Sequence, residues 1–319
     1  MIKTLAGIVL IAAANLAAAQ AAYPTKPVRL INPFPPGGGA SVIGRVIAQE
    51  LSERLGQSVV FDNRGGAGGI IGMEIAARAA PDGYTLTMAT ASTVSIHPLL
   101  SKVPFDPLKD FAPVSHVSNV PLILVVHPAV AVKSAKDFIA LAKAQPGKLN
   151  FASSGKGTIS HLAGELFKFN TGVSMVHVPY RGGGPALIDV VGGQVQSNFA
   201  NILSSLPHVK GGRLRGLAVT SARRSSAINE LPTIAESGIP GYEVVQWNGM
   251  LAPARVPSAI IARLNSEVER ILQLAEMKTR LAADGADPLG GPPEKFSAFI
   301  RADIEKWAKV IKAANVQVD

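Results

Sequence analysis

Residues 28–41 read VRLINPFPPGGGAS, and this stretch joins a strand pattern to a helix pattern. The apolar run 28–32 predicts a buried strand, and the periodicity from Ser41 to about Leu55 predicts an amphipathic helix. Two prolines stiffen the turn between them, and glycines 37–39 leave backbone N–H groups that a ligand can approach closely. Ser41 is expected to cap the helix. Such a loop, at the carboxyl end of a strand, is typical of an anion-binding site.

The same stretch could also be a Pro/Gly turn that binds nothing. It is not a Walker A loop, because Gly-Lys-Ser/Thr does not follow, and it lacks the G-x-G-x-x-G spacing of a dinucleotide site. If a ligand does bind here, a β-branched residue at Gly38 should block it. Such a side chain would occupy the space of the ligand and disfavour the backbone angles of the turn.

The composition indicates a globular protein with a basic surface. The chain has 319 residues, of which 47% are hydrophobic and 17% charged, enough for a large core and two domains. Its 31 Lys and Arg exceed its 22 Asp and Glu by nine, which suits an anionic ligand. The densest basic group, at positions 213, 215, 223 and 224, has no aromatic residues beside it. We therefore expect no nucleic-acid partner.

Cysteine is absent, which excludes thiol catalysis, Cys-ligated zinc, disulfides and a lipoprotein anchor. The six histidines show neither H-x-x-x-H nor H-E-x-x-H spacing. We expect neither a metal nor a cofactor.

The amino terminus has the pattern of a secretory signal peptide. A basic start at residues 1–3 precedes an apolar stretch at 4–14 and small residues as far as Ala22, with Ala19-Gln20-Ala21 as a cleavage motif. Because the apolar core is short, we prefer a cleaved signal peptide over an uncleaved membrane anchor. We assign residues 1–21 to the signal and expect an exported, periplasmic protein.

Strand and helix patterns alternate through the rest of the chain, which predicts an α/β fold with mainly parallel sheets. The pattern divides into a first domain, residues 22–123 with 247–319, and a second domain, residues 124–246. The expected strands lie at 28–32, 59–61, 85–89, 122–126, 150–152, 175–178, 195–199, 217–220, 242–247 and 250–252, and the helices at 41–55, 70–80, 134–144, 160–170, 257–273 and 293–313.

Four loops offer backbone N–H groups or short hydroxyls, a combination that suits a carboxylate. They span residues 37–41, 91–93, 153–158 and 180–184. Lys156 and Arg181 are either ligand contacts or solvated rim residues. Asn198, Asn201, Trp247 and Asn248 either line a cleft or belong to turns and core.

Ser153, Ser154 and His161 raise the alternative of a serine hydrolase. The G-x-S-x-G elbow is missing, and no acidic residue is evidently placed to orient the histidine. We expect His161 to face solvent or a helix partner, and we expect no enzymatic activity.

A series of short motifs follows in order along almost the whole chain. They lie at residues 27–31, 33–39, 63–64, 66–69, 80–86, 110–114, 146–150, 153–155, 157–158, 161–167, 177–180, 192–195, 217–221 and 231–233. In these stretches the chain resembles the periplasmic solute-binding receptors of tripartite tricarboxylate transporters, the Bug-type receptors.

The resemblance implies a two-domain periplasmic binding protein, type II-like, whose crossing strands form a hinge that closes over one organic anion. It implies a carboxylate held by the first loop, partly through bridging waters, and delivery to the membrane subunits of such a transporter. The ligand could be a di- or tricarboxylate, an acidic amino acid or an aromatic carboxylate, and a sensory role is the alternative to transport. We expect a monomer.

Many members of the family carry Asp where this chain has Ser41, so a more anionic or less polar ligand would bind more easily. With the four loops, the resemblance gives a candidate ligand site: Phe34, Pro36, Gly37, Gly38, Gly39, Ala40, Ser41, Ala91, Ser92, Thr93, Ser153, Ser154, Gly155, Gly157, Thr158, Tyr180, Asn198 and Asn201.

Overall fold

The computed structural model describes residues 23–314 and 316, so the expected signal peptide lies outside the described residues. Its strands are β1 (Val28–Asn32), β2 (Val59–Asn63), β3 (Thr85–Thr90), β4 (Phe111–Val126), β5 (Asn150–Ser153), β6 (Val176–Pro179), β7 (Ser197–Asn201), β8 (Arg215–Val219), β9 (Val245–Pro253) and β10 (Asp287–Pro288). Its longer helices are α2 (Gly39–Leu55), α3 (Ile70–Ala77), α5 (Ala135–Ala144), α6 (Ile159–Thr171), α7 (Gly183–Val191), α8 (Ile202–Lys210), α9 (Ser258–Gln273), α10 (Ala275–Ala283) and α11 (Pro293–Ala313). Short helical turns are η1 (Ala67–Gly69), η2 (Ser92–Ile96), α4 (His97–Leu100) and η3 (Ser226–Ile228).

The strands form one curled mixed sheet in the order β2-β1-β3-β9-β4-β7-β5-β6. One end of the sheet, β2-β1-β3, is parallel, and so is the other, β7-β5-β6. Between them β4 and β9 pair antiparallel with each other and with β7 and β3. The α/β, two-domain expectation is confirmed. The sheet is mixed rather than mainly parallel, because the long strands β4 and β9 form antiparallel pairs in its centre.

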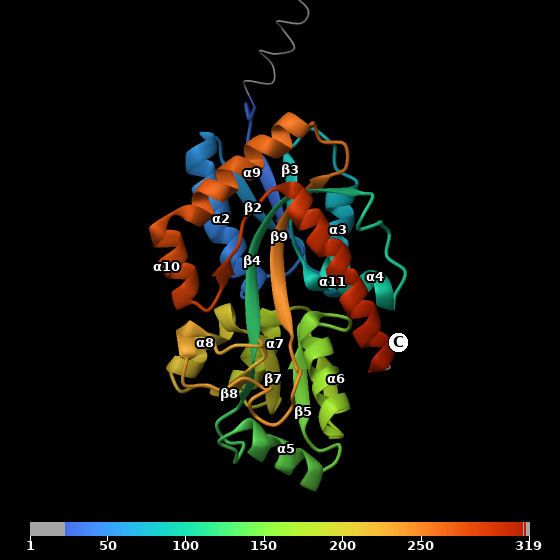
Figure 1. Ribbon diagram of the computed structural model, residues 1–319, viewed down its shortest axis with the longest axis vertical. Helices are drawn as coiled ribbons and strands as arrows, with labels where there is room; N and C mark the ends of the chain where they lie inside the picture. The colour runs from blue at the N-terminus through green and yellow to red at the C-terminus, as the bar shows by residue number, and fades with distance from the viewer. Residues whose placement is uncertain (1–22, 315, 317–319) are drawn as a thin grey trace, which may run out of the picture.

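Figure 1 shows two lobes joined by β4 and β9, which run along both. We call β1–β3 with α2–α4 and α9–α11 the first lobe, and α5–α8 with β5–β8 the second lobe. The expected domain boundaries, 123/124 and 246/247, fall inside these two long strands. The register of β4 against β9 shifts between Pro113 and Ser115 and between His116 and Ser118, and such irregularities let a long strand bend and twist.

Helix α2 begins earlier than expected, and Ser41 does not cap it. The N-cap is Gly38, without a side-chain hydrogen bond, and Ser41 lies buried in the first turn. The helix ends at Gly56, whose left-handed φ of 66° is a common helix terminator. The sequence did predict the start of α5, where the Ser134 side chain accepts from Asp137 N–H at 3.1 Å.

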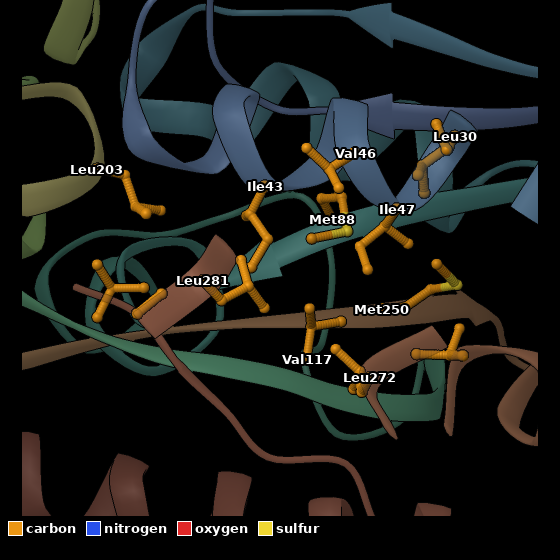
Figure 2. Packing of buried hydrophobic residues seen from close by; sticks show 14 of the residues in the cluster. Leu30, Ile43, Val46, Ile47, Met88, Val117, Leu203, Met250, Leu272 and Leu281 are labelled. Carbon is orange, nitrogen blue, oxygen red and sulfur yellow. The ribbon is translucent and has the colours of Figure 1, made fainter. Parts of the chain in front are cut away.

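The apolar face of α2 packs against the sheet in the core of the first lobe. Ile43, Val46 and Ile47 recur at helical spacing and are buried against the sheet, on the side that carries Met88 of β3 (Figure 2). Leu203 of α8 belongs to the same cluster although it comes from the second lobe. Apolar contact therefore reaches across the division between the lobes at α2 and α8.

The long α11 covers the crossing strands, and Trp247 of β9 anchors it. The Trp247 Nε1 donates to Asp303 Oδ2 at 2.7 Å, and both side chains are buried. Within residues 23–314 and 316, the structure contains no helix long and apolar enough to cross a bilayer.

Candidate functional site

A small cavity of about 40 Å³ lies between the lobes, close to the crossing strands. Both lobes supply its walls, and no side chain among the described lining residues carries a formal charge. The lining residues are Phe34, Gly38, Gly39, Ala40, Ser92, Leu122, Ser154, Ile159, Ser160, Gly183, Asn198, Phe199, Ala200, Asn201, Ser204 and Gln246.

Four helices present their N-terminal ends to this cavity. Gly39 begins α2, Ile159 begins α6 and Gly183 begins α7, while Asn201 caps α8. Within these described helices the first turn contains no acidic residue. The first N–H groups of a helix lack intrahelical partners and carry partial positive charge. The cavity is therefore electropositive through backbone dipoles, although its side chains are neutral.

Glycines allow the two lobes to meet at the edge of the cavity. A Cβ on Gly184 would lie 2.6 Å from Pro36 O, and one on Gly37 would lie 3.3 Å from Gly184 Cα. A Cβ on Gly39 would overlap the Asn201 amide. Side chains at these positions would hold the lobes apart.

Gly38 differs from its neighbours. Its φ of −87° is available to any residue, and a Cβ there would lie 3.8 Å from Gly183 N, an ordinary contact. The expectation that the backbone angles of Gly38 forbid a side chain is therefore wrong, and Gly39 is the sterically restricted position.

Ser92 ties the lobes together. Its Oγ accepts the backbone N–H of Ile159 at 2.9 Å, and both residues are buried. Ser92 follows β3 in the first lobe, whereas Ile159 opens α6 in the second lobe. This bond satisfies one N–H of the α6 terminus and joins the lobes beside the cavity.

Two amide side chains leave buried polar atoms without partners among the described residues. Asn201 Oδ1 accepts the N–H of Leu203 at 3.1 Å, which orients the amide and leaves Nδ2 unpaired. Asn198 is 3% exposed, and its Oδ1 is also unpaired. Both residues line the cavity. Because buried polar groups are nearly always hydrogen-bonded, these atoms indicate that the cavity is built for a polar occupant.

Hydroxyl groups line the side of the cavity near α6. Ser154 Oγ and Ser160 Oγ are 2.8 Å apart, and Ser160 Oγ also accepts Ser154 N–H at 2.9 Å. Thr158 Oγ1 donates to Gly155 O at 2.7 Å. These bonds shape the loop 153–158 and hold Ser154 at the cavity wall.

Two stacked histidines support that loop from behind. Ser153 Oγ lies 2.6 Å from His177 Nε2, and Gly157 N–H donates to His161 Nδ1 at 3.2 Å. The two rings stack at 3.9 Å. Burial and neighbouring cations lower the pKa of His161 to about 3 and that of His177 to about 4, so both rings are neutral at pH 7.

The expectation that His161 faces solvent or a helix partner is met in its second form. The side chain is buried, and its Nε2 lies 3.7 Å from Glu165 Oε1 on the same helix, an acidic neighbour that the sequence analysis did not assign to it. The serine–histidine pair of the hydrolase alternative, Ser154 with His161, does not form. Ser154 Oγ lies beside Ser160 Oγ, and the histidine that contacts Ser153 is His177. Ser153 is fully buried. Among the described residues, the structure gathers no group of three potential metal ligands from His, Cys, Asp and Glu.

The structure brings part of the candidate set to the cavity wall: Phe34, Gly38, Gly39, Ala40, Ser92, Ser154, Asn198 and Asn201. Other members lie behind the wall as buried supports: Ser41, Ala91, Thr93, Ser153, Gly155, Gly157 and Thr158. Thr93 Oγ1, for example, bonds to the backbone of Thr90. Which of these residues contact a ligand stays a prediction.

Pro36, Gly37 and Tyr180 are not among the residues that line the cavity. Pro36 and Gly37 line an outer groove, and Tyr180 OH donates to Asp189 Oδ2 at 2.6 Å. Lys156 and Arg181 are exposed and are not among the lining residues. Trp247 and Asn248 lie in the buried core, and the neighbouring Gln246 reaches the cavity instead.

The candidate set omitted half of the wall, although one omitted residue, Gly183, lies in the predicted loop 180–184. The omitted residues are Leu122, Ile159, Ser160, Gly183, Phe199, Ala200, Ser204 and Gln246. A signal was available for Ser204, because Asn201 is a favoured N-cap residue and marks the start of α8. Leu122 and Phe199 gave no such signal, because they look like ordinary core positions of buried strands.

Comparison with known proteins gives consistent matches over the whole chain. Residues 43–316 match the model of the tripartite tricarboxylate transporter family receptor. The chain is 39% identical over 315 residues to Protein BugT of Bordetella pertussis, which covers 97% of this chain and 96% of BugT.

Solved structures agree with this match. The structure of Rpa4515 of R. palustris with adipate has a TM-score of 0.90 and 38% identity, covering 92% of this chain and 99% of that one. MatC of Rhodopseudomonas palustris with bound malate has a TM-score of 0.86 and 30% identity, covering 91% and 100%.

Proposed function

Because this chain belongs to the tripartite tricarboxylate transporter receptor family, we propose that it captures a small organic carboxylate and delivers it to a tripartite membrane transporter. The family membership confirms the resemblance seen in the motifs. The observation that carries the proposal is the convergence of four helix N-termini on a cavity with neutral side chains.

A carboxylate fits these helix ends better than a cation or a neutral solute does. Helix N-termini stabilise negative charge, and first-turn N–H groups donate to anionic oxygens. Asn201 Nδ2 adds an unpaired donor. Bonds from such donors to a charged acceptor contribute roughly 1.5–3 kcal/mol each, so a few suffice for micromolar binding.

Relatives guide the choice of ligand. One similar structure holds adipate and another holds malate, which are both aliphatic dicarboxylates. Phe34, Leu122 and Phe199 give the cavity of this chain apolar surface for a carbon chain. We propose aliphatic dicarboxylates as the first class to test, with acidic amino acids and aromatic carboxylates next.

Capture requires the lobes to move apart. A cavity of about 40 Å³ has room for ordered water but is smaller than a dicarboxylate. We propose that residues 22–123 with 247–319 and residues 124–246 are the moving units, and that β4 and β9 bend between them. The protein would act as a periplasmic monomer after removal of residues 1–21, and it would catalyse no reaction.

A thermal-shift screen of the mature protein tests the proposal. A ligand that binds only the folded state at 100 times its Kd adds about 2.7 kcal/mol to the free energy of unfolding. At least one carboxylate should raise the melting temperature, and metal salts and neutral sugars should not. A panel in which every carboxylate leaves the melting temperature unchanged would contradict the proposal. If the wild type hydrolyses ester substrates and Ser153→Ala or Ser154→Ala does not, the protein is a hydrolase and the binding-protein proposal fails.

A further inference from the structure

A second hollow lies on the outer side of the contact between the lobes. It has a volume of about 570 Å³, and both lobes line it. The first lobe contributes Pro35, Pro36, Gly37 and Val42, and the second lobe contributes Gly184, Pro185, Leu187, Ile188, Leu203, Ser204, Pro207 and His208. We call these residues the outer groove.

The outer groove and the ligand cavity share one wall. Gly37 and Gly184 line the groove, while the adjacent Gly38 and Gly183 line the cavity, and Ser204 lines both. Because the groove takes its sides from both lobes, it has this shape only while the lobes are together. Its geometry therefore depends on the state of the ligand site.

The groove is mainly apolar. Ile188 has the largest exposed fraction of the large hydrophobic side chains in the described part of the chain, 69%. Proline and leucine side chains flank it, and the described lining residues include no acidic side chain. The nearby Asp189 is engaged by the hydroxyl of Tyr180.

Two exposed arginines adjoin residues of the groove. Arg213 is exposed and near enough to His208 to lower the pKa of that imidazole, together with burial. Arg181 is also exposed, and the Gly182 that follows it packs against Pro35. An occupant should therefore carry an apolar segment with acidic side chains beside it.

We propose that the outer groove docks an apolar segment, flanked by acidic residues, of a transporter membrane subunit, and that it does so only when the lobes are closed. This inference rests on the proposed transport function. Exposed apolar surface on a soluble protein commonly marks an interaction site. A site composed of both lobes lets the transporter distinguish a receptor with closed lobes from one with open lobes.

Two substitutions test the groove without touching the cavity wall. Ile188→Ser removes the exposed apolar side chain, and Arg213→Glu reverses the rim charge. Phe169→Ser and Arg301→Glu are matched controls, because Phe169 is 56% exposed on α6 and Arg301 is exposed on α11. Circular dichroism and thermal melting establish that each variant folds.

The probe is the pair of membrane subunits from the same organism, reconstituted in lipid vesicles, with the carboxylate returned by the thermal screen. Each groove variant should bind that carboxylate within about twofold of wild type by calorimetry. Each should co-sediment with the vesicles at least tenfold more weakly, whereas the controls should behave as wild type. Wild-type co-sedimentation should itself weaken about tenfold without carboxylate.

Normal co-sedimentation of both groove variants would overturn the inference, as would wild-type binding that is independent of carboxylate. Sedimentation velocity that shows a wild-type dimer lost on Ile188→Ser would assign the groove to a second copy of the chain and would also overturn it. These outcomes leave carboxylate binding intact. Failure of the proposed function is distinct, because calorimetry would then show no carboxylate binding by the wild type.

Discussion

Ser92 in the first lobe accepts the backbone N–H of Ile159 in the second lobe over 2.9 Å, with both residues buried. The bond lies at the cavity wall, where α6 begins. It therefore exists only when the lobes are together.

Ser92→Ala should weaken ligand binding because it leaves the Ile159 N–H buried without a partner in the closed state. An unpaired buried donor costs about 1–3 kcal/mol, which corresponds to roughly 5- to 150-fold in affinity. Calorimetry with the carboxylate from the screen measures the change. The control is Ser221→Ala, which removes a bond to the nearby Arg223 carbonyl within the second lobe. Equal affinities for Ser92→Ala and wild type would show that this bond does not contribute to closure.

Gly39→Ala should impair closure more than folding. A Cβ at this position overlaps the Asn201 amide of the other lobe, so the lobes must separate or Asn201 must release its bond to Leu203. We expect at least about a tenfold loss of affinity, or 1.4 kcal/mol. Gly192→Ala is the control, because this residue lies outside the cavity wall, its φ of −79° suits any residue, and a Cβ there would meet only contacts of 3.4 Å or more. The steric account fails if both variants bind alike.

Asn198→Asp tests the charge preference of the cavity. The substitution keeps the shape of a side chain that is 3% exposed and adds a negative charge beside the bound carboxylate. Two like charges about 4 Å apart repel by about 4 kcal/mol at an effective dielectric constant of 20. Binding should therefore fall at least a hundredfold, while the exposed Asn229→Asp should have no effect. Tighter carboxylate binding by Asn198→Asp would contradict an electropositive cavity.

The buried histidines predict that stability falls in mild acid. Burial lowers the pKa of His97 to about 4, and burial with neighbouring cations lowers that of His161 to about 3 and that of His177 to about 4. The unfolded chain protonates these groups near pH 6.5, so it binds more protons than the folded protein below that pH. The contribution of these histidines to the free energy of unfolding should thus be fully present above pH 6.5. It should decrease toward pH 4, by up to about 3 kcal/mol for His97.

Urea unfolding at pH 7.5 and pH 5 measures this loss, in a range where most carboxylates stay ionised. His161→Asn removes one titrating group and retains an acceptor for Gly157 N–H, so its loss should be smaller than that of wild type. A free energy that is the same at both pH values would mean that the histidines are not held neutral.

The sequence was a good guide to elements whose signals are local. The expected helix at 134–144 begins one residue before α5, and the helix periodicity at 293–313 matches α11 residue for residue. Strand β1 has its expected bounds, and β3 and β5 each extend one residue beyond the expected end. Each of these signals depends on residues within one element, so tertiary contacts did not alter it.

The sequence was a poor guide where tertiary contacts decide the structure. Strand β4 is 16 residues long although it contains Pro113 and Pro121, because its partners in both lobes extend it. Helix α8 was not predicted, because Pro207 within it is a helix-breaking signal in the sequence. Asn201 was a candidate by position, but its close approach to Gly39 comes from a lobe contact that no local pattern encodes.

We propose that backbone amides and neutral side chains hold a carboxylate between the lobes. Calorimetry of the mature protein, with the carboxylate from the screen compared with its amide of the same shape, measures whether the negative charge is needed. We predict micromolar or tighter binding of the carboxylate and at least hundredfold weaker binding of the amide, because the helix N-termini act on charge. Equal binding of the two compounds, or of neither, would contradict the account.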